Sequence, residues 1–396
     1  MALASEESFW ADVQHGDEFR KILRKSLARR RKDVVERDDV AGGLGPVEEG
    51  GGEQQGAEEG GDLFSGGGGA AEKDHPVRVA ATLGEEHDQK DALREAHTIS
   101  IRSAASRKLR WGRALLDNVG MTPAEARDAF SRLLHTPEAE LDLAEGALLI
   151  AAEEYQEMRP AVYLNQIARM AADLKKRIRT EVDPERVVEI VNDYFFEELH
   201  YRGNRQEYYD PRNSYLNDVI ERRVGIPITL AVLYVAVGER AGLPVRGVGM
   251  PGHFLVKYSP AAADVDIFVD AFNARTMNRS ECTKMLQEMY GEAVPMRPAL
   301  LQPSTKRQIL ARILNNLKSL YMSRNDLPRA LAASDRIMLT DPHLTSEWRD
   351  HGMIQLQLRR DSGALKDFSR YLAIRPEPED AARVKQLRSD LISRLN

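Results

Sequence analysis

Residues 225–237 are the stretch that most constrains the fold, because the helix that Gly225, Ile226 and Pro227 open would be apolar on almost every side. Pro227 suits the first turn of this helix, where its missing N–H costs little. Gly242 and Pro244 are suited to end it. A helix that is hydrophobic all round must be buried on all sides. We therefore expect a central helix with a folded domain built around it.

The segment before this helix, YYDPRNSYLN at residues 208–217, predicts an aromatic turn followed by a short helix. Pro211 disfavours helical geometry at Asp210, and Asn213 or Ser214 can cap the short helix. The segment after the central helix contains three stretches rich in Val, Phe and Ile, at residues 244–250, 252–258 and 266–272. Short runs of this kind, with turn residues between them, predict antiparallel strands.

These segments together resemble the transglutaminase-like core. The buried helix is followed by AGLPVRGVG, and then by GHFLV and VDAFN on the next two expected strands. The closer resemblance is to the bacterial SirB-one family, which joins such a core to a C-terminal tetratricopeptide segment. The motifs YYDPRNSYLN, ERRVGIPITL and PGHFLV carry it, and the similarity spans roughly residues 142–372.

The resemblance also implies where a site would lie. In the transglutaminase-like core, a Cys at the N-terminus of the buried helix is paired with a His and an Asp on neighbouring strands. The resemblance places His253 on the His strand and Asp270 on the Asp strand. The cysteine position falls on Pro227, which carries no nucleophile, whereas a thiol there would be activated by the helix and the histidine. We therefore expect a retained His–Asp pair that is not catalytic.

Other nucleophiles fit this site less well. Thr229 lies on the same helix, but its side chain should point about 200° around the axis from Pro227. Cys282 follows the third expected strand, at the start of a helix that runs to residue 290, where we expect a half-buried small residue. A cysteine-type hydrolase or acyltransferase that uses Cys282 or a nucleophile from a remote segment is the alternative to a non-catalytic protein.

Polar side chains gather around the aromatic turn, namely Asp210, Arg212, Asn213, Asn217, Arg222 and Arg223. One interpretation is a structural network of helix caps and a buried ion pair. The other is a recognition surface beside His253, in which Arg212 or Arg223 binds a carboxylate in fork geometry. The candidate binding residues are Tyr209, Asp210, Arg212, Asn213, Arg223, Pro227 and His253.

Composition limits the other functional classes. A net charge of −6 disfavours nucleic-acid binding, which needs a concentrated basic surface. The nine histidines are scattered, and neither HExxH nor CxxC occurs, so we expect no metal site and no cofactor. No run of roughly 18 apolar residues is present. The single cysteine and the acidic residues near the start favour a soluble protein of the cytoplasm without a transit peptide.

The N-terminal region, residues 1–94, is expected to be mostly disordered. Residues 41–70 contain 13 of the 28 glycines, mixed with glutamates. Such a segment cannot bury enough apolar surface to offset the entropy lost on ordering. The basic residues 18–35 predict a helix, which is either a binding helix for an anionic surface or partner, or a marginal solvated helix.

From residue 95 onward the sequence predicts helices that lead into the core. Thr122-Pro123-Ala124-Glu125 combines a capping residue, a proline in first position and the acid of a capping box. This helix should run to His135. Further helices are expected at residues 103–119, 141–155, 163–178 and 187–200.

The C-terminal third repeats with the tetratricopeptide period. Asp341-Pro342 and Arg375-Pro376 are 34 residues apart, as that repeat requires. The pattern predicts two helical units and a capping helix, at residues 310–343, 344–376 and 382–395. Two units are too few for an independent solenoid, so they should pack on the core.

These observations predict an α+β protein, with a helical lead-in, a transglutaminase-like core with a small antiparallel sheet, and an α-helical tetratricopeptide tail. The expected regions are residues 1–94, 95–300 and 301–396. We expect a non-catalytic interaction or regulatory module that binds a protein or peptide partner.

Overall fold

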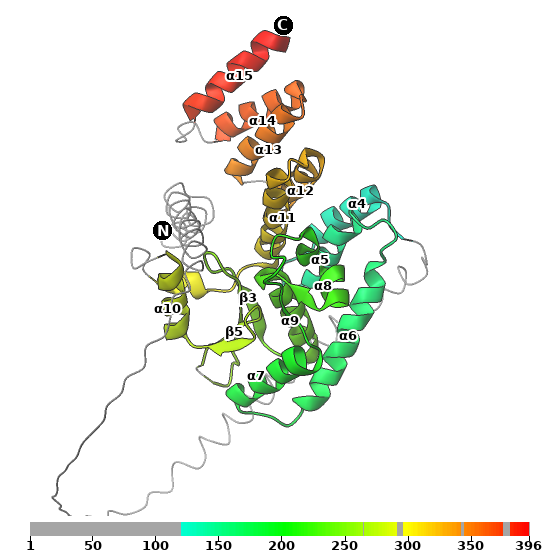
Figure 1. Ribbon diagram of the computed structural model, residues 1–396, viewed down its shortest axis with the longest axis vertical. Helices are drawn as coiled ribbons and strands as arrows, with labels where there is room; N and C mark the ends of the chain where they lie inside the picture. The colour runs from blue at the N-terminus through cyan, green and yellow to red at the C-terminus, as the bar shows by residue number, and fades with distance from the viewer. Residues whose placement is uncertain (1–119, 264, 291–295, 342–343, 375–380, 396) are drawn as a thin grey trace, which may run out of the picture. The chain divides into compact units, whose positions relative to one another are not determined.

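The computed structural model describes residues 120–263, 265–290, 296–341, 344–374 and 381–395. The region expected to be disordered, the basic helix and the helix at residues 103–119 lie outside the described residues. Within them, helices precede and follow a small antiparallel sheet (Figure 1). The predicted α+β architecture is thus confirmed.

Four α-helices form the part of the lead-in that the structure describes. They are α4 (Pro123–Leu134), α5 (Leu143–Ala152), α6 (Pro160–Arg177) and α7 (Pro184–Asn192), and a π-helix (Asp193–Glu198) continues the last. The capping box predicted for α4 is present, since the Thr122 side chain accepts from the Glu125 N–H and the Glu125 carboxylate accepts from the Thr122 N–H. Helix α5 is almost entirely apolar and buried, so the core contains a second central helix.

The buried helix predicted first is α9 (Pro227–Ala241). Every residue from Pro227 to Gly238 is buried, and Pro227 occupies the first turn. Gly242 ends the helix with a φ of 96°, a conformation that favours glycine. The position and burial of α9 therefore agree with its sequence.

The capping residue predicted before α8 (Leu216–Arg222) is wrong. Asn213 and Ser214 lie inside a 3₁₀ turn (Pro211–Ser214), and Tyr215 precedes α8 without a side-chain capping bond. The side chain of Asp210 caps the 3₁₀ turn instead, by accepting from the Arg212 N–H at 3.0 Å. Because Pro211 fixes its own φ in a helical range, the turn begins directly at the proline and moves the cap upstream.

The main sheet has four antiparallel strands in the order β3 (Val245–Val248), β4 (Leu255–Tyr258), β5 (Ile267–Asp270) and β6 (Arg275–Met277). The three predicted strands are confirmed, although each is shorter than its apolar run. Strand β6 was not predicted, since it has three residues of which two are exposed. A separate parallel pair, β1 (Arg202–Gly203) and β2 (Val224–Gly225), joins the loop before α8 to the entrance of α9.

Helices cover the two faces of the main sheet. Helix α9 packs closely on β3, where a Cβ at Gly238 would lie 2.7 Å from a Val245 methyl carbon. On the other face, residues from all four strands form an apolar cluster with α10 (Arg279–Tyr290) and a 3₁₀ turn (Pro298–Leu301). Its buried members are Val248, Met250, Leu255, Phe268, Met277, Cys282, Met285 and Leu301.

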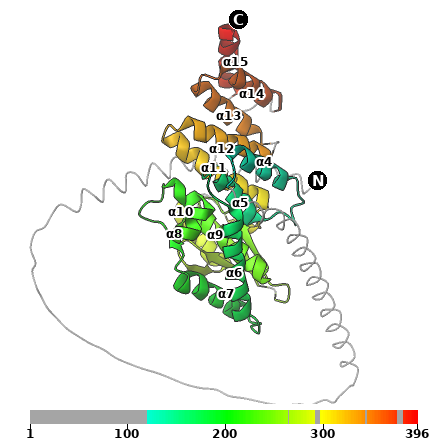
Figure 2. The same cartoon turned by 90° about the vertical axis from the view of Figure 1, so that its right-hand side faces the viewer.

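After α10 and the 3₁₀ turn come five more described helices, namely α11 (Lys306–Ser323), α12 (Leu327–Thr340), α13 (Thr345–Gln357), α14 (Asp361–Ile374) and α15 (Ala381–Leu395). They form the two predicted helical hairpins and the capping helix. Helix α11 contacts α5 and α9, and α12 contacts α4 (Figure 2). The Tyr215 and Tyr321 hydroxyls are 2.6 Å apart across this junction. The first repeat therefore packs on the core, as was predicted for both repeats.

Candidate functional site

His253 and Asp270 lie side by side in the folded chain. Nε2 of His253 is 2.8 Å from Oδ1 of Asp270, whose side chain is fully buried, while that of His253 is 11% exposed. Asp270 is the last residue of β5. His253 precedes β4 instead of lying on it, because Gly252 forms a turn with a φ of 68° directly before it. The predicted pairing is present, and the predicted strand position of His253 is wrong.

Several donors fix the Asp270 carboxylate. The N–H groups of Phe272 and Asn273 donate to Oδ1, each at 3.2 Å, and Nδ2 of Asn273 donates to Oδ2 at 2.6 Å. Burial alone would raise the pKa of Asp270, but the hydrogen bonds from His253 and Asn273 outweigh it and lower that pKa. An ionised, immobile carboxylate therefore orients the His253 ring.

Among the residues that the structure describes, the hydrogen-bond partner of the His253 ring is the Asp270 carboxylate, and no thiol or hydroxyl bonds to the ring. In a catalytic triad, the histidine activates a nucleophile while the aspartate orients the histidine. The arrangement here can orient an imidazole and hold a proton, but it includes only the orienting half of a triad.

Thr229 is engaged by the backbone. Its hydroxyl donates to the Asn213 carbonyl at 2.6 Å and accepts from the Ile226 N–H at 3.2 Å. The side chain is 1% exposed. Thr229 thus joins the 3₁₀ turn to the start of α9, and its hydroxyl is committed to that structural role.

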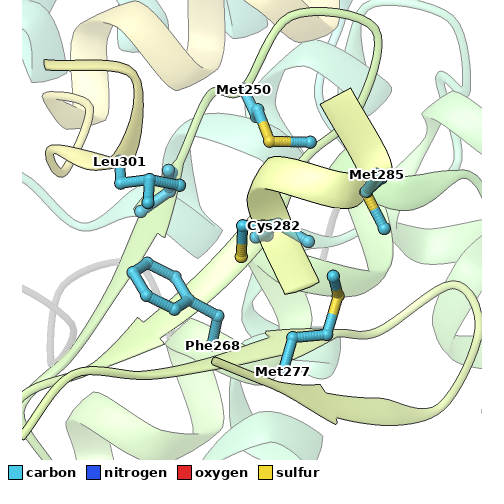
Figure 3. Packing of buried hydrophobic residues seen from close by; sticks show 8 residues of the cluster. Met250, Phe268, Met277, Cys282, Met285 and Leu301 are labelled. Atoms are coloured by element: carbon cyan, nitrogen blue, oxygen red, sulfur yellow. The ribbon is translucent and has the colours of Figure 1, made fainter. Parts of the chain in front are cut away.

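Cys282 is completely buried, so the prediction of a half-buried cysteine is wrong. Figure 3 shows its sulfur inside the apolar cluster that also contains Met250, Phe268 and Met277. Burial raises the pKa of the Cys282 thiol to about 11, which keeps it in the unreactive protonated form. The sequence did not show this enclosure because the surrounding residues come from strands β3 to β6.

The polar residues around the aromatic turn mostly bind one another. Arg212 and Arg222 lie 2.8 and 3.3 Å from Oδ2 of Asp210. Burial raises the pKa of Asp210, but the hydrogen bonds from Arg212 outweigh it, so the pKa is lowered. Asn213 is fully buried, and its Nδ2 donates to the Glu207 carbonyl at 2.6 Å. Arg223 ends α8 in the left-handed region, with a φ of 57°. These contacts fit the structural interpretation of the motif.

Tyr208 and Tyr209 provide an exposed aromatic edge, with 41% and 74% of their surface accessible. The Tyr208 ring packs edge-on against Tyr209 and Phe272, with centroid separations of 5.3 and 5.9 Å. Phe272 follows Asp270 by two residues. Arg205 lies over the Phe272 ring at 5.7 Å and donates to Oδ1 of Asn273 at 2.5 Å. The aromatic turn therefore lies against the segment that holds the Asp270 carboxylate.

Arg312 on α11 is a site residue that the sequence analysis missed. Its Nη2 donates to the carbonyls of Met250 and His253, at 3.0 and 2.8 Å. Its guanidinium lies 5.4 Å from the centroid of the Phe254 ring. The positive charge of Arg312 also opposes the rise in the Tyr208 pKa that burial causes, so the two side chains are neighbours. In the sequence, Arg312 is only a charged residue at the edge of an apolar helix face, and this position does not indicate which residues it contacts.

Gly252 allows a further close approach beside His253. A Cβ at this position would overlap the hydroxyl oxygen of Tyr290, the last residue of α10.

Across the described part of the chain, no three His, Cys, Asp or Glu side chains are grouped to hold a metal ion. In the same residues, no helix is long and apolar enough to cross a membrane.

Comparisons with known proteins agree with this architecture. A family model described as the transglutaminase-like superfamily matches residues 161–315, and one described as tetratricopeptide repeat matches residues 317–389. The UPF0162 protein of Xylella fastidiosa (strain 9a5c) is 39% identical over 249 residues, which are 62% of this chain and 88% of that protein. The UPF0162 protein of Vibrio cholerae is 26% identical over 245 residues, which are 62% of this chain and 90% of its own.

A eukaryotic relative shares a shorter segment. F-box only protein 21 of Mus musculus is 33% identical over 141 residues, which are 34% of this chain and 22% of that protein. The bacterial relatives, in contrast, are matched over most of their length and carry the same combination of core and repeats. The chain belongs to the UPF0162 family of transglutaminase-like proteins with tetratricopeptide repeats.

Proposed function

We propose that the protein is a non-catalytic interaction module whose transglutaminase-like core binds a protein partner. The observation that carries this proposal is Pro227 at the position that the family resemblance assigns to the nucleophile. The His253–Asp270 pair is kept in hydrogen-bonding geometry at 2.8 Å although proline provides no group for it to activate. A pair kept without its nucleophile can still serve as a binding element.

The partner-binding part is the His253 surface, which we define as His253, Tyr208, Tyr209, Phe272 and Arg312. Tyr208 packs against Tyr209 and Phe272, and Arg312 donates to the His253 carbonyl. The two groups are joined because the charge of Arg312 acts on Tyr208, and because the His253 ring and the Phe272 N–H both bond to Asp270. Tyrosine and arginine are enriched in the buried centres of protein interfaces. The exposure of Tyr209 leaves a large aromatic side chain available to a partner.

The tetratricopeptide helices support the same role. Arg324, in the turn after α11, donates to the Tyr209 carbonyl at 2.9 Å, and so holds the exposed loop against the first repeat. A cysteine-type hydrolase would need a thiolate next to His253. Cys282 has a raised pKa and lies in an apolar cluster, so we favour binding over catalysis.

Site-specific photo-crosslinking tests the proposal. A benzophenone amino acid replaces Tyr209 in the full chain, and adducts formed in the native host are identified by mass spectrometry. The matched control carries the same amino acid at Val182, which is 90% exposed in the loop before α7. We expect a defined protein adduct from position 209 that position 182 does not give. Identical or absent adducts from both positions would contradict the proposal.

A further inference from the structure

Arg312 is a half-buried cation that has no acidic partner among the described residues. Its Nη2 is used by two backbone carbonyls, and within the described residues no carboxylate oxygen lies within 4 Å of its guanidinium. Burial lowers its pKa to about 10, so the group is still charged at neutral pH. The nitrogens Nε and Nη1 have no hydrogen-bond acceptor in this part of the chain. The side chain therefore has donors left for a ligand.

Other arginines of this protein that are largely buried are paired with a carboxylate. Four further arginines, with side chains no more than 24% exposed, each place a nitrogen 2.5–3.4 Å from a carboxylate oxygen. They are Arg222, Arg240, Arg336 and Arg349. A buried charge is costly unless it is paired. The missing pair at Arg312 thus distinguishes it from these four.

Two more arginines flank the His253 surface. Arg205 lies over Phe272 and donates to an amide oxygen, and Arg324 donates to the Tyr209 carbonyl. Neither has a carboxylate within 4 Å in the part of the chain that the structure describes. The acids of the loop do not neutralise them, because Asp210 pairs with other arginines and Glu207 forms no ion pair with any described residue. A locally positive surface therefore exists in a chain with a net charge of −6.

We propose that Arg312 binds the side-chain carboxylate of an Asp or Glu in a linear peptide segment of the partner, with a neighbouring apolar residue against Tyr208, Tyr209 and Phe272. This inference rests on the proposed interaction function and names the chemistry of the partner. The planar guanidinium matches a carboxylate in geometry as well as in charge. Tyr208 is a neighbour of Arg312, and the exposed surface of Tyr208 and Tyr209 is available to the residues on either side of the acid.

Peptide selection on the full-length protein tests this assignment and does not require the partner to be identified first. A displayed library of random linear peptides is selected on the wild type and on Arg312→Met. We expect the wild type to enrich sequences with Asp or Glu beside an aromatic or aliphatic residue, and Arg312→Met to lose them. A synthetic fluorescent copy of the best sequence and its Asn or Gln counterpart are then titrated by fluorescence anisotropy.

The change in the peptide is the decisive arm, because Arg312→Met also removes two hydrogen bonds from the turn before His253. We expect the Asn or Gln peptide to bind the intact wild type about tenfold more weakly, or worse. Both peptides should bind Arg312→Met with the same low affinity. The control Arg383→Met removes an exposed arginine from α15 and should leave both affinities unchanged.

The outcomes separate the two proposals. Enriched peptides that lack acidic residues, or equal affinities for the acidic peptide and its amide counterpart, overturn the carboxylate assignment and leave the interaction function standing. No enrichment of any peptide also overturns the assignment, and the crosslinking at position 209 then decides the interaction function on its own.

Discussion

His253 and His351 are both held by aspartates, but only one of them has both ring nitrogens occupied by described residues. In the repeats, Nδ1 of His351 is 2.7 Å from Asp367 and Nε2 is 2.9 Å from Asp335, so the ring joins α12, α13 and α14. Burial lowers the pKa of His351, but the hydrogen bonds that its ring donates to Asp335 and Asp367 outweigh it and raise the pKa to about 9. In the core, His253 has one aspartate and one nitrogen without a partner among the described residues.

The number of occupied ring nitrogens separates a structural His–Asp pair from one that is open to a partner. A histidine with both nitrogens satisfied inside a helical layer is explained by stability alone. The ring of His253 instead has a fixed orientation and one nitrogen without a described partner. It lies beside exposed tyrosines and an arginine without a described counter-charge. Stability alone does not explain this arrangement. The two sites therefore make different predictions for stability and for binding.

The largest expected effect is that of His351→Ala on stability. The substitution leaves Asp367, which is almost fully buried, without its counter-charge. Removing one member of a buried ion pair costs about 3–5 kcal/mol. Denaturant unfolding measures this loss, and His135→Ala, at an exposed helix end, is the matched control with an expected change within about 0.5 kcal/mol. A loss as small as that of the control would show that the two aspartates do not depend on His351.

Asp270→Ala should have a smaller effect on stability and an additional effect on binding. It leaves the His253 ring nitrogen without its acceptor, which costs about 1–3 kcal/mol of unfolding free energy. If the pair also orients the ring for a partner, the affinity for that partner should fall by a comparable amount. Unfolding curves and a binding titration of the same two proteins separate these contributions. If neither quantity changes, the pair has neither role.

The two histidines should also differ in how they make stability depend on pH. The pKa of His351 is higher in the folded state than in the unfolded state. Protonated His351 therefore stabilises the fold, and this contribution is fully present below about pH 6.5. That contribution is lost as the pH rises through about 9. We expect the thermal midpoint to fall by at least ~2 °C between pH 6.5 and pH 9.5. The fall should be reduced in His351→Gln and kept in His253→Gln. An equal fall in both variants would contradict the difference between the two histidines.

The smallest effect concerns thiol chemistry. Iodoacetamide should label the folded protein only at Cys282, and more slowly than a free thiol, because the thiol is buried and its pKa is raised to about 11. Mass spectrometry over a time course measures the rate, with the unfolded protein as the reference. Rapid and saturable labelling that His253→Ala abolishes would instead support a catalytic cysteine.

Much of the fold was predictable because its signals are local. The uniform apolarity of α9, the capping box at Thr122 and the 34-residue spacing in the repeats each depend on nearby residues. Strand β6 was not predictable from its own three residues, which have no apolar alternation. The regional boundaries at residues 95 and 301 remain predictions.

The site was predictable only in part. His253 and Asp270 were found through the family resemblance and not through any pattern of their own. The contact of Arg312 with His253 joins positions 59 residues apart, and no periodicity within either segment records it. The burial of Cys282 likewise depends on several strands that close around one helix.

Helix α11 belongs to two modules at once. It begins the first repeat, while its Arg312 reaches the turn that carries His253, and the match to the transglutaminase-like family continues to residue 315 within the helix. The repeats therefore cannot be exchanged for those of another protein by a cut before this helix without removing part of the core. A substitution in α11 therefore acts on the first repeat and on the turn that carries His253 at the same time.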